Sequence, residues 1–128
     1  MNILEHIINT LKADARIILM TQDRIYSAKI PQGAKMPYIF VEQITNPRTD
    51  HFLNRHSELP ESSLQINIFT KVKQSSELLR KCVVEDVQDL DLVDPNIDLV
   101  EVDEDITITN LDANESFPQA VGLKITHN

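Results

Sequence analysis

The sequence has 128 residues, enough for one domain with a single hydrophobic core. Two glycines disfavour glycine-rich phosphate loops, and no apolar run reaches the roughly 18 residues that cross a membrane. The net charge of −8 is unevenly placed: residues 82–123 hold twelve Asp or Glu and no Lys or Arg, which disfavours a nucleic-acid reader.

The N-terminal residues predict two short helices. Asn2 is a favourable N-cap, and Glu5 stands where a capping box places an acidic side chain. Asp14 is expected to cap a second helical turn that reaches Leu19. Residues at helical spacing form the apolar stripe of the first helix: Ile3, Leu4, Ile7, Ile8 and Leu11. The start of the chain lacks the basic segment and the small-residue cleavage site of a signal peptide. The single Cys is unable to form an internal disulfide, which suits a reducing cytoplasm.

A short strand is expected at residues 24–27 and a longer one at residues 38–44, joined through a loop at 31–37. Two prolines and a glycine in that loop leave no regular ladder of backbone hydrogen bonds. The longer strand alternates, so Ile39 and Val41 are expected to face the core. Phe40 would then lie on the opposite face, which indicates that both faces are partly covered.

Residues 46–62 form a long polar connection whose ends are able to extend the two flanking strands into a projecting hairpin. Loops longer than about 12 residues are usually functional or disordered. We expect a subunit interface here, because apolar side chains in a polar loop favour a partner. The alternative is that Phe52 and Leu53 pack on their own sheet. The interface candidates are Arg48, His51, Phe52, Leu53, Arg55 and His56.

A strand followed directly by an amphipathic helix, at residues 63–90, forms the centre of the predicted core. In the strand, Leu64, Ile66, Ile68 and Thr70 share one face. The helix is expected over residues 75–90, with Ser75 and Ser76 as its cap. Its apolar stripe, flanked by Leu78, is formed by Leu79, Cys82, Val83, Val87 and Leu90.

The C-terminal third predicts strands at residues 97–102, 106–109 and 120–126. Leu99 and Val100 break the alternation of the first of these and indicate a bulge. Its acidic end is expected to line either a channel or a subunit interface; the candidates are Glu101, Asp103, Glu104 and Asp105. The fold class is therefore α+β in a single domain, residues 1–128: an antiparallel or mixed sheet of about five strands with two main helices on one face, in the order α-β-β-β-α-β-β.

No constellation in the sequence indicates catalysis, a cofactor or a metal. Asp94, Asn96 and Asp98 imitate a calcium loop, but Leu99 stands where the tight turn needs glycine. The histidines, including His6 and His127, lack a zinc-ligand set and are expected to be solvated. Cys82 lies on an apolar helix face and is expected to be a buried, inert thiol.

Several segments carry a family resemblance through their order and spacing. They are Arg24-Ile25-Tyr26, Pro31-Gln32 and Met36-Pro37-Tyr38-Ile39-Phe40-Val41, followed by Leu64-Gln65-Ile66-Asn67-Ile68-Phe69 and the helix at 75–90. Together they resemble the small tail-completion proteins of long-tailed bacteriophages, also called tail-to-head joining or tail-terminator proteins. The resemblance extends from the first helix to residue 90, and the C-terminal third matches only in outline.

This resemblance implies a structural virion assembly protein without catalysis or cofactor. Its copies would form a sixfold ring at the head-proximal end of the tail tube, made in the cytoplasm of the bacterial host. Its partners would be further copies of itself, the tail-tube protein and the head–tail connector. DNA would pass through the ring without sequence-specific binding, and no membrane would be contacted.

Two other classes of protein stay open from the residues alone. One is a small cytoplasmic α+β module that binds proteins as an adaptor or inhibitor. The other is an enzyme, which the lack of any recognisable site disfavours. Terminator and joining proteins share one fold, so the sequence does not separate these two roles.

Overall fold

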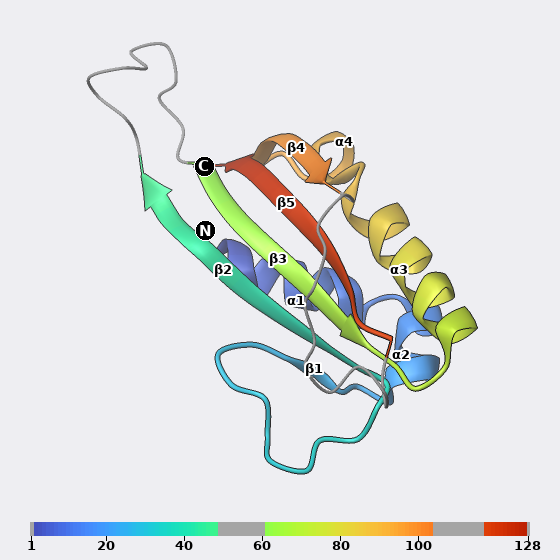
Figure 1. Cartoon of the computed structure of the whole chain (residues 1–128). Helices are drawn as coiled ribbons and strands as arrows, with labels where there is room; N and C mark the ends of the chain where they lie inside the picture. Colours follow the sequence, from blue (N-terminus) through green and yellow to red (C-terminus); the bar gives the residue numbers. More distant parts are fainter. Residues whose placement is uncertain (1, 49–60, 104–116, 128) are drawn as a thin grey trace.

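The computed structural model describes residues 2–48, 61–103 and 117–127. Helices cover one face of a five-stranded sheet, and the other face is turned towards the reader in Figure 1. The elements in chain order are α1 (Ile3–Lys12), α2 (Ala15–Thr21), β1 (Ile25–Tyr26), β2 (Tyr38–Arg48), β3 (Glu61–Phe69), α3 (Lys73–Val87), α4 (Leu90–Val93), β4 (Ile97–Asp103) and β5 (Gln119–His127).

The sheet has the strand order β1-β2-β3-β5-β4. The first pair is parallel, with Ile25 opposite Ile39, and the other three pairs are antiparallel. The sheet is therefore mixed, and the predicted α+β class and element order are confirmed. None of the helices in the described ranges is long and apolar enough to cross a membrane.

Local capping explains where the first two helices begin. The Asn2 side chain accepts a hydrogen bond from the Glu5 amide at 3.1 Å, and Asp14 accepts one from the Arg16 amide at 2.8 Å. Each bond satisfies a backbone donor that the first helical turn leaves without a partner. Both predicted caps are confirmed, although the second helix continues past Leu19 to Thr21.

The core lies between the helices and the inner face of the sheet. Ile39 and Val41 are fully buried there, as predicted, and Phe40 is half-buried on the other face. The predicted stripes of α1, β3 and α3 all supply this core, while Leu78 is exposed. On β5 the same face carries Val121, Leu123 and Ile125, as predicted.

The start of α3 differs from the prediction. The helix begins at Lys73, its N-cap is Val72 without a side-chain cap bond, and Ser76 lies buried inside the first turns. The Ser76 hydroxyl donates to the carbonyl oxygen of Phe117 at 2.8 Å, and the Phe117 amide donates to the carbonyl oxygen of Thr70 at 2.8 Å. The serine hydroxyl therefore ties the residues before β5 to the β3–α3 junction and does not cap the helix.

Replacing Ser76 by alanine is expected to lower the free energy of unfolding by about 1–2 kcal/mol. The loss arises because the substitution leaves the Phe117 carbonyl without its donor at a partly buried position. Urea denaturation followed by circular dichroism measures it. Ser75→Ala is the matched control, since Ser75 is only half-buried, and it is expected to change stability by no more than about 0.5 kcal/mol.

Several boundaries differ from those predicted. The predicted helix at 75–90 is divided, because α3 ends at Val87 and the short α4 starts at Leu90. The irregularity in β4 lies between Ile97 and Leu99, one step before the predicted bulge. The strands flanking the long connection extend as far as Arg48 and from Glu61, and the predicted strand at 106–109 lies outside the described residues.

Candidate interaction surfaces

The predicted interface candidates fall mostly beyond the described part of the chain. Arg48 is the last residue of β2 and stands opposite Glu61 of β3. The other five candidates, His51, Phe52, Leu53, Arg55 and His56, lie outside the described residues. The structure thus places the base of the connection beside the β2–β3 pair, and the interface prediction stays a prediction.

Two of the acidic candidates lie on an edge of the sheet. Glu101 and Asp103 are exposed on β4, while Glu104 and Asp105 lie outside the described residues. Among the described residues, no strand pairs with the outer edge of β4, and β1 pairs with only Ile39 and Phe40 of β2. Unpaired edges expose backbone donors and acceptors that another chain is able to use.

A hollow of about 310 Å³ lies on the open face of the sheet, between β2 and β4. It has a physical cause in the register, since Gly122 stands opposite Gln65 on one side and Asp103 on the other. A glycine has no side chain, so the surface drops there, between Ile44 and Glu101 at the margins. Lys124 lies directly across from Glu101.

A polar cluster covers the same face towards β2. The Gln65 amide donates to the Asn67 side-chain oxygen at 2.7 Å, and the Asn67 amide donates to Glu42 Oε1 and to the Phe40 carbonyl at 3.2 Å each. Asn67 is only 5% exposed, so these bonds offset the cost of burying its amide. The open face is therefore polar and ordered at its centre, with the hollow beside it.

The helical side carries an ion cluster that sequence reasoning did not find. Arg16 on α2 contacts Asp14 at 2.9 Å, Glu85 at 2.8 Å and Asp86 at 3.6 Å. Hydrogen bonds from Arg16 hold the pKa of Asp14 at about 2, despite partial burial. Burial and the adjacent Asp14 carboxylate raise the pKa of Asp86 to about 7.

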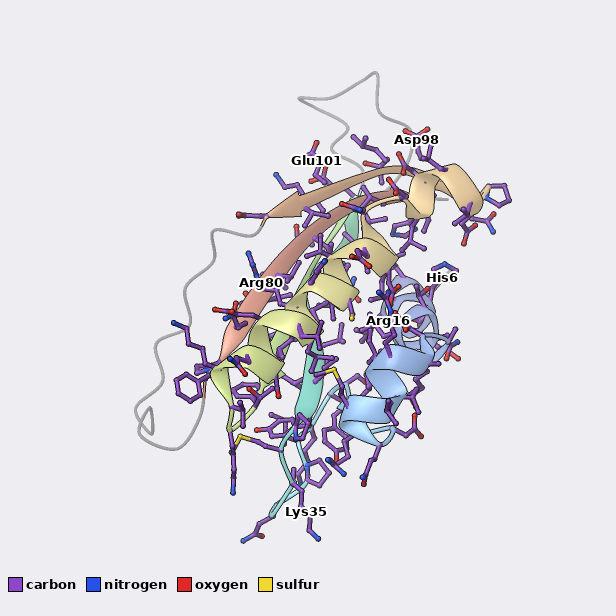
Figure 2. All side chains as sticks on the ribbon, turned by 90° about the vertical axis from the view of Figure 1, so that its right-hand side faces the viewer. His6, Arg16, Lys35, Arg80, Asp98 and Glu101 are labelled. Carbon is purple, nitrogen blue, oxygen red and sulfur yellow. The ribbon has the colours of Figure 1, made fainter. Side chains whose placement is uncertain are left out.

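A second hollow, of about 300 Å³, lies between α2 and α3 beside this cluster. Leu19 is 82% exposed and Leu78 54% exposed at its margin, and Cys82 forms part of its lining. Figure 2 shows Arg16 on this helical side, away from the open face of the sheet. The Cys82 thiol is buried, as predicted, and burial raises its pKa, which disfavours the reactive thiolate.

His127 differs from the predicted solvated state, whereas the His6 side chain stays 31% exposed and forms an ion-pair contact. His127 is 2% exposed, and its Nε2 lies 2.8 Å from the Ser62 hydroxyl, so it fills a core position opposite Ile97. His6 lies 2.7 Å from Asp94 and links α1 to the start of the β4 segment. The prediction failed because strand register and helix packing, which bring distant residues together, are not visible in local spacing.

No group of three or more metal-ligating side chains occurs in the part of the chain that the structure describes. Asp94, from the rejected calcium pattern, accepts a hydrogen bond from the Asn96 amide at 2.9 Å and contacts His6. These contacts give Asp94 a structural role in closing the turn before β4.

Comparison with known proteins identifies a shared fold. A chain of the virion of a native gene transfer agent (GTA) particle superposes with a TM-score of 0.65 at 11% sequence identity, covering 94% of this chain and 90% of that chain. No protein-family profile matches the sequence, and no curated protein matches it.

Proposed function

We propose that this chain is a structural subunit of a tailed, phage-like virion, which caps the tail tube and joins it to the head connector as a ring. The observation that carries the proposal is the shared fold with a virion chain over 94% of the present chain. The order of the segments from Arg24 to the helix α3 supports it independently, because they resemble tail-completion proteins. In this proposal the protein acts by surface complementarity and needs no catalytic group.

The surfaces described above suit such a subunit. Ring closure needs two different patches on each copy, since each subunit contacts one neighbour with one patch and the next neighbour with the other. Among the described residues, the outer edge of β4 and most of the outer edge of β2 have no paired strand, and these two edges supply separate patches. We further propose that the connection with Arg48, His51, Phe52, Leu53, Arg55 and His56 contacts a neighbouring subunit, the tail-tube protein or the connector.

Electron microscopy of the purified protein mixed with tail tubes from the same virus tests the proposal. Gold-labelled protein is expected at one end of each tube, and particles made without the protein are expected to contain separate heads and tails. Protein found along the sides of the tubes, or absent from them, would contradict the proposal, as would normal particles made without it.

The acidic segment with Glu101, Asp103, Glu104 and Asp105 has two candidate roles in this ring. Carboxylates lining a channel would let DNA slide without binding, and carboxylates in an interface would meet basic groups of a neighbour. Reversing the charges of Asp103 and Glu104 is expected to stop assembly in the second case. In the first case it would leave assembled particles that fail to eject or package DNA, and a wild-type yield would exclude both roles.

A further inference from the structure

A basic loop projects from the end of the molecule opposite to β4. Residues 27–37 join β1 to β2 and include Lys29 and Lys35, both exposed, and no acidic residue. Arg24 Nε donates to the Pro37 carbonyl at 3.2 Å across the base of the loop, and a turn from Pro31 to Ala34 shapes its tip. Figure 1 shows the loop extending beyond the sheet at the lower end of β2.

The acidic edge lies at the other end. Strand β4 carries Asp98, Glu101 and Asp103 and no Lys or Arg. Figure 2 shows Asp98 and Glu101 at the end of the molecule opposite to Lys35. The hollow at Gly122 lies beside this edge, with Glu101 and Asp103 along one margin, Ile44 along the other, and Lys124 also in its lining. The molecule therefore has a basic projection at one end and, towards the other, an acidic hollow in which two carboxylates outnumber the single ammonium group of Lys124.

We infer that the basic loop of one copy docks into the acidic hollow of the next copy. A contact between two different ends of the same chain is head-to-tail, and repeated contacts of this kind close into a ring or extend as a filament. The inference rests on the proposed function for its biological role, because it supplies the contact that would close the ring.

The chemistry of the two surfaces favours a second copy as the occupant. The hollow combines the carboxylates of Glu101 and Asp103 with the apolar side chain of Ile44, and Lys124, directly across from Glu101, offsets one of the two negative charges. This lining suits a lysine whose alkyl stem packs on apolar surface while its ammonium group meets the remaining negative charge. Because Gly122 has no side chain, another backbone is able to approach the floor of the hollow closely. A nucleic acid is disfavoured here, because the phosphates would meet the carboxylates of β4.

Charge reversal on both sides tests the inference by sedimentation velocity at about 50 mM salt, where exposed charges are less screened than in the cell. The wild-type chain is expected to self-associate, and to do so less as salt increases. The double variant Lys29→Glu/Lys35→Glu is expected to associate about tenfold more weakly, since each reversal replaces an attraction by a repulsion. Unchanged melting temperatures would show that the variants are folded.

Two further samples make the test specific. The matched control, Lys71→Glu/Lys81→Glu, changes the charge equally at two other exposed lysines and is expected to associate like the wild type. Mixing the loop variant with Glu101→Lys/Asp103→Lys is expected to restore association, because each surface then meets an opposite charge. A loop variant that associates like the wild type, a mixture without recovery, or a wild-type chain that stays monomeric would each overturn the inference.

The proposed function is tested separately from this inference. If the protein binds tube ends and the loop variant self-associates like the wild type, only this inference is contradicted. If the protein self-associates through the loop and the hollow but does not bind tail tubes, the inference is supported and the virion role is contradicted.

Discussion

Replacing Ile66 by alanine is expected to lower the free energy of unfolding by about 3–4 kcal/mol. Ile66 is fully buried at the centre of the sheet, where it pairs with Val41 on β2 and Val121 on β5, both fully buried. Truncation removes apolar contacts and leaves a cavity that two neighbouring strands cannot close without breaking their own register. Domains are stable by only about 5–15 kcal/mol, so this loss is a large share of the total.

Urea denaturation followed by far-ultraviolet circular dichroism measures the change, since the chain has no Trp to report by fluorescence. Leu92→Ala is the matched control, because Leu92 on α4 is 78% exposed. It removes a similar side chain and is expected to change stability by no more than about 0.5 kcal/mol. Equal effects of the two substitutions would contradict the placement of Ile66 in the core.

The core was predictable because its pattern is local. The alternation of Leu64, Ile66 and Ile68 and the helical spacing of Leu79, Val83 and Val87 each need only a short window of sequence. All six residues are buried, and the element order follows from them. The start of α3 was harder to predict, because serine often caps helices. Ser76 instead forms a hydrogen bond to Phe117, 41 positions later.

The surfaces were less predictable because they depend on register and on distant pairs. The hollow exists because Gly122 is aligned with Gln65 and Asp103, which no single segment reveals. The Arg16–Glu85 contact joins residues 69 positions apart. Acidic residues are abundant in residues 82–123, so nothing in the sequence distinguishes Asp86 from its neighbours.

The wild-type chain is expected to lose stability as the pH rises from 4 to 7. Replacing Asp86 by asparagine is expected to remove this loss. Burial and the Asp14 carboxylate raise the pKa of Asp86 from 3.8 to about 7 in the folded chain. The folded chain therefore keeps a proton in this range that the unfolded chain has released, and its stability falls as the pH rises. Above pH 7 the folded chain holds a buried carboxylate, whose Oδ2 has no hydrogen-bond partner among the described residues.

Asparagine keeps the shape and stays uncharged, and its amide is able to donate to Asp14. The interval from pH 3.8 to about 7 sets a limit of about 4 kcal/mol, at about 1.4 kcal/mol for each pH unit. The Asp86 side chain is 17% exposed and lies 3.6 Å from Arg16, which reduces the cost of its charge. We therefore expect Asp86→Asn to be more stable than the wild type by about 2 kcal/mol at pH 8, with no difference near pH 4.

The ionisation of Asp14 affects stability with the opposite pH dependence, so its contribution is distinguishable from that of Asp86. The pKa of Asp14 is lowered to about 2, chiefly by its hydrogen bond to Arg16, so its stabilisation is present above pH 4 and is lost as the pH falls towards 2. Urea denaturation of the wild-type chain and of Asp86→Asn at intervals from about pH 2 to pH 8 measures the two effects. Glu85→Gln is the matched control, because Glu85 is 40% exposed and its contact with Arg16 is worth about 0.5 kcal/mol or less at any of these pH values. An Asp86→Asn variant whose stability follows the wild-type curve in parallel from pH 4 to pH 8 would show that Asp86 ionises normally in the folded chain.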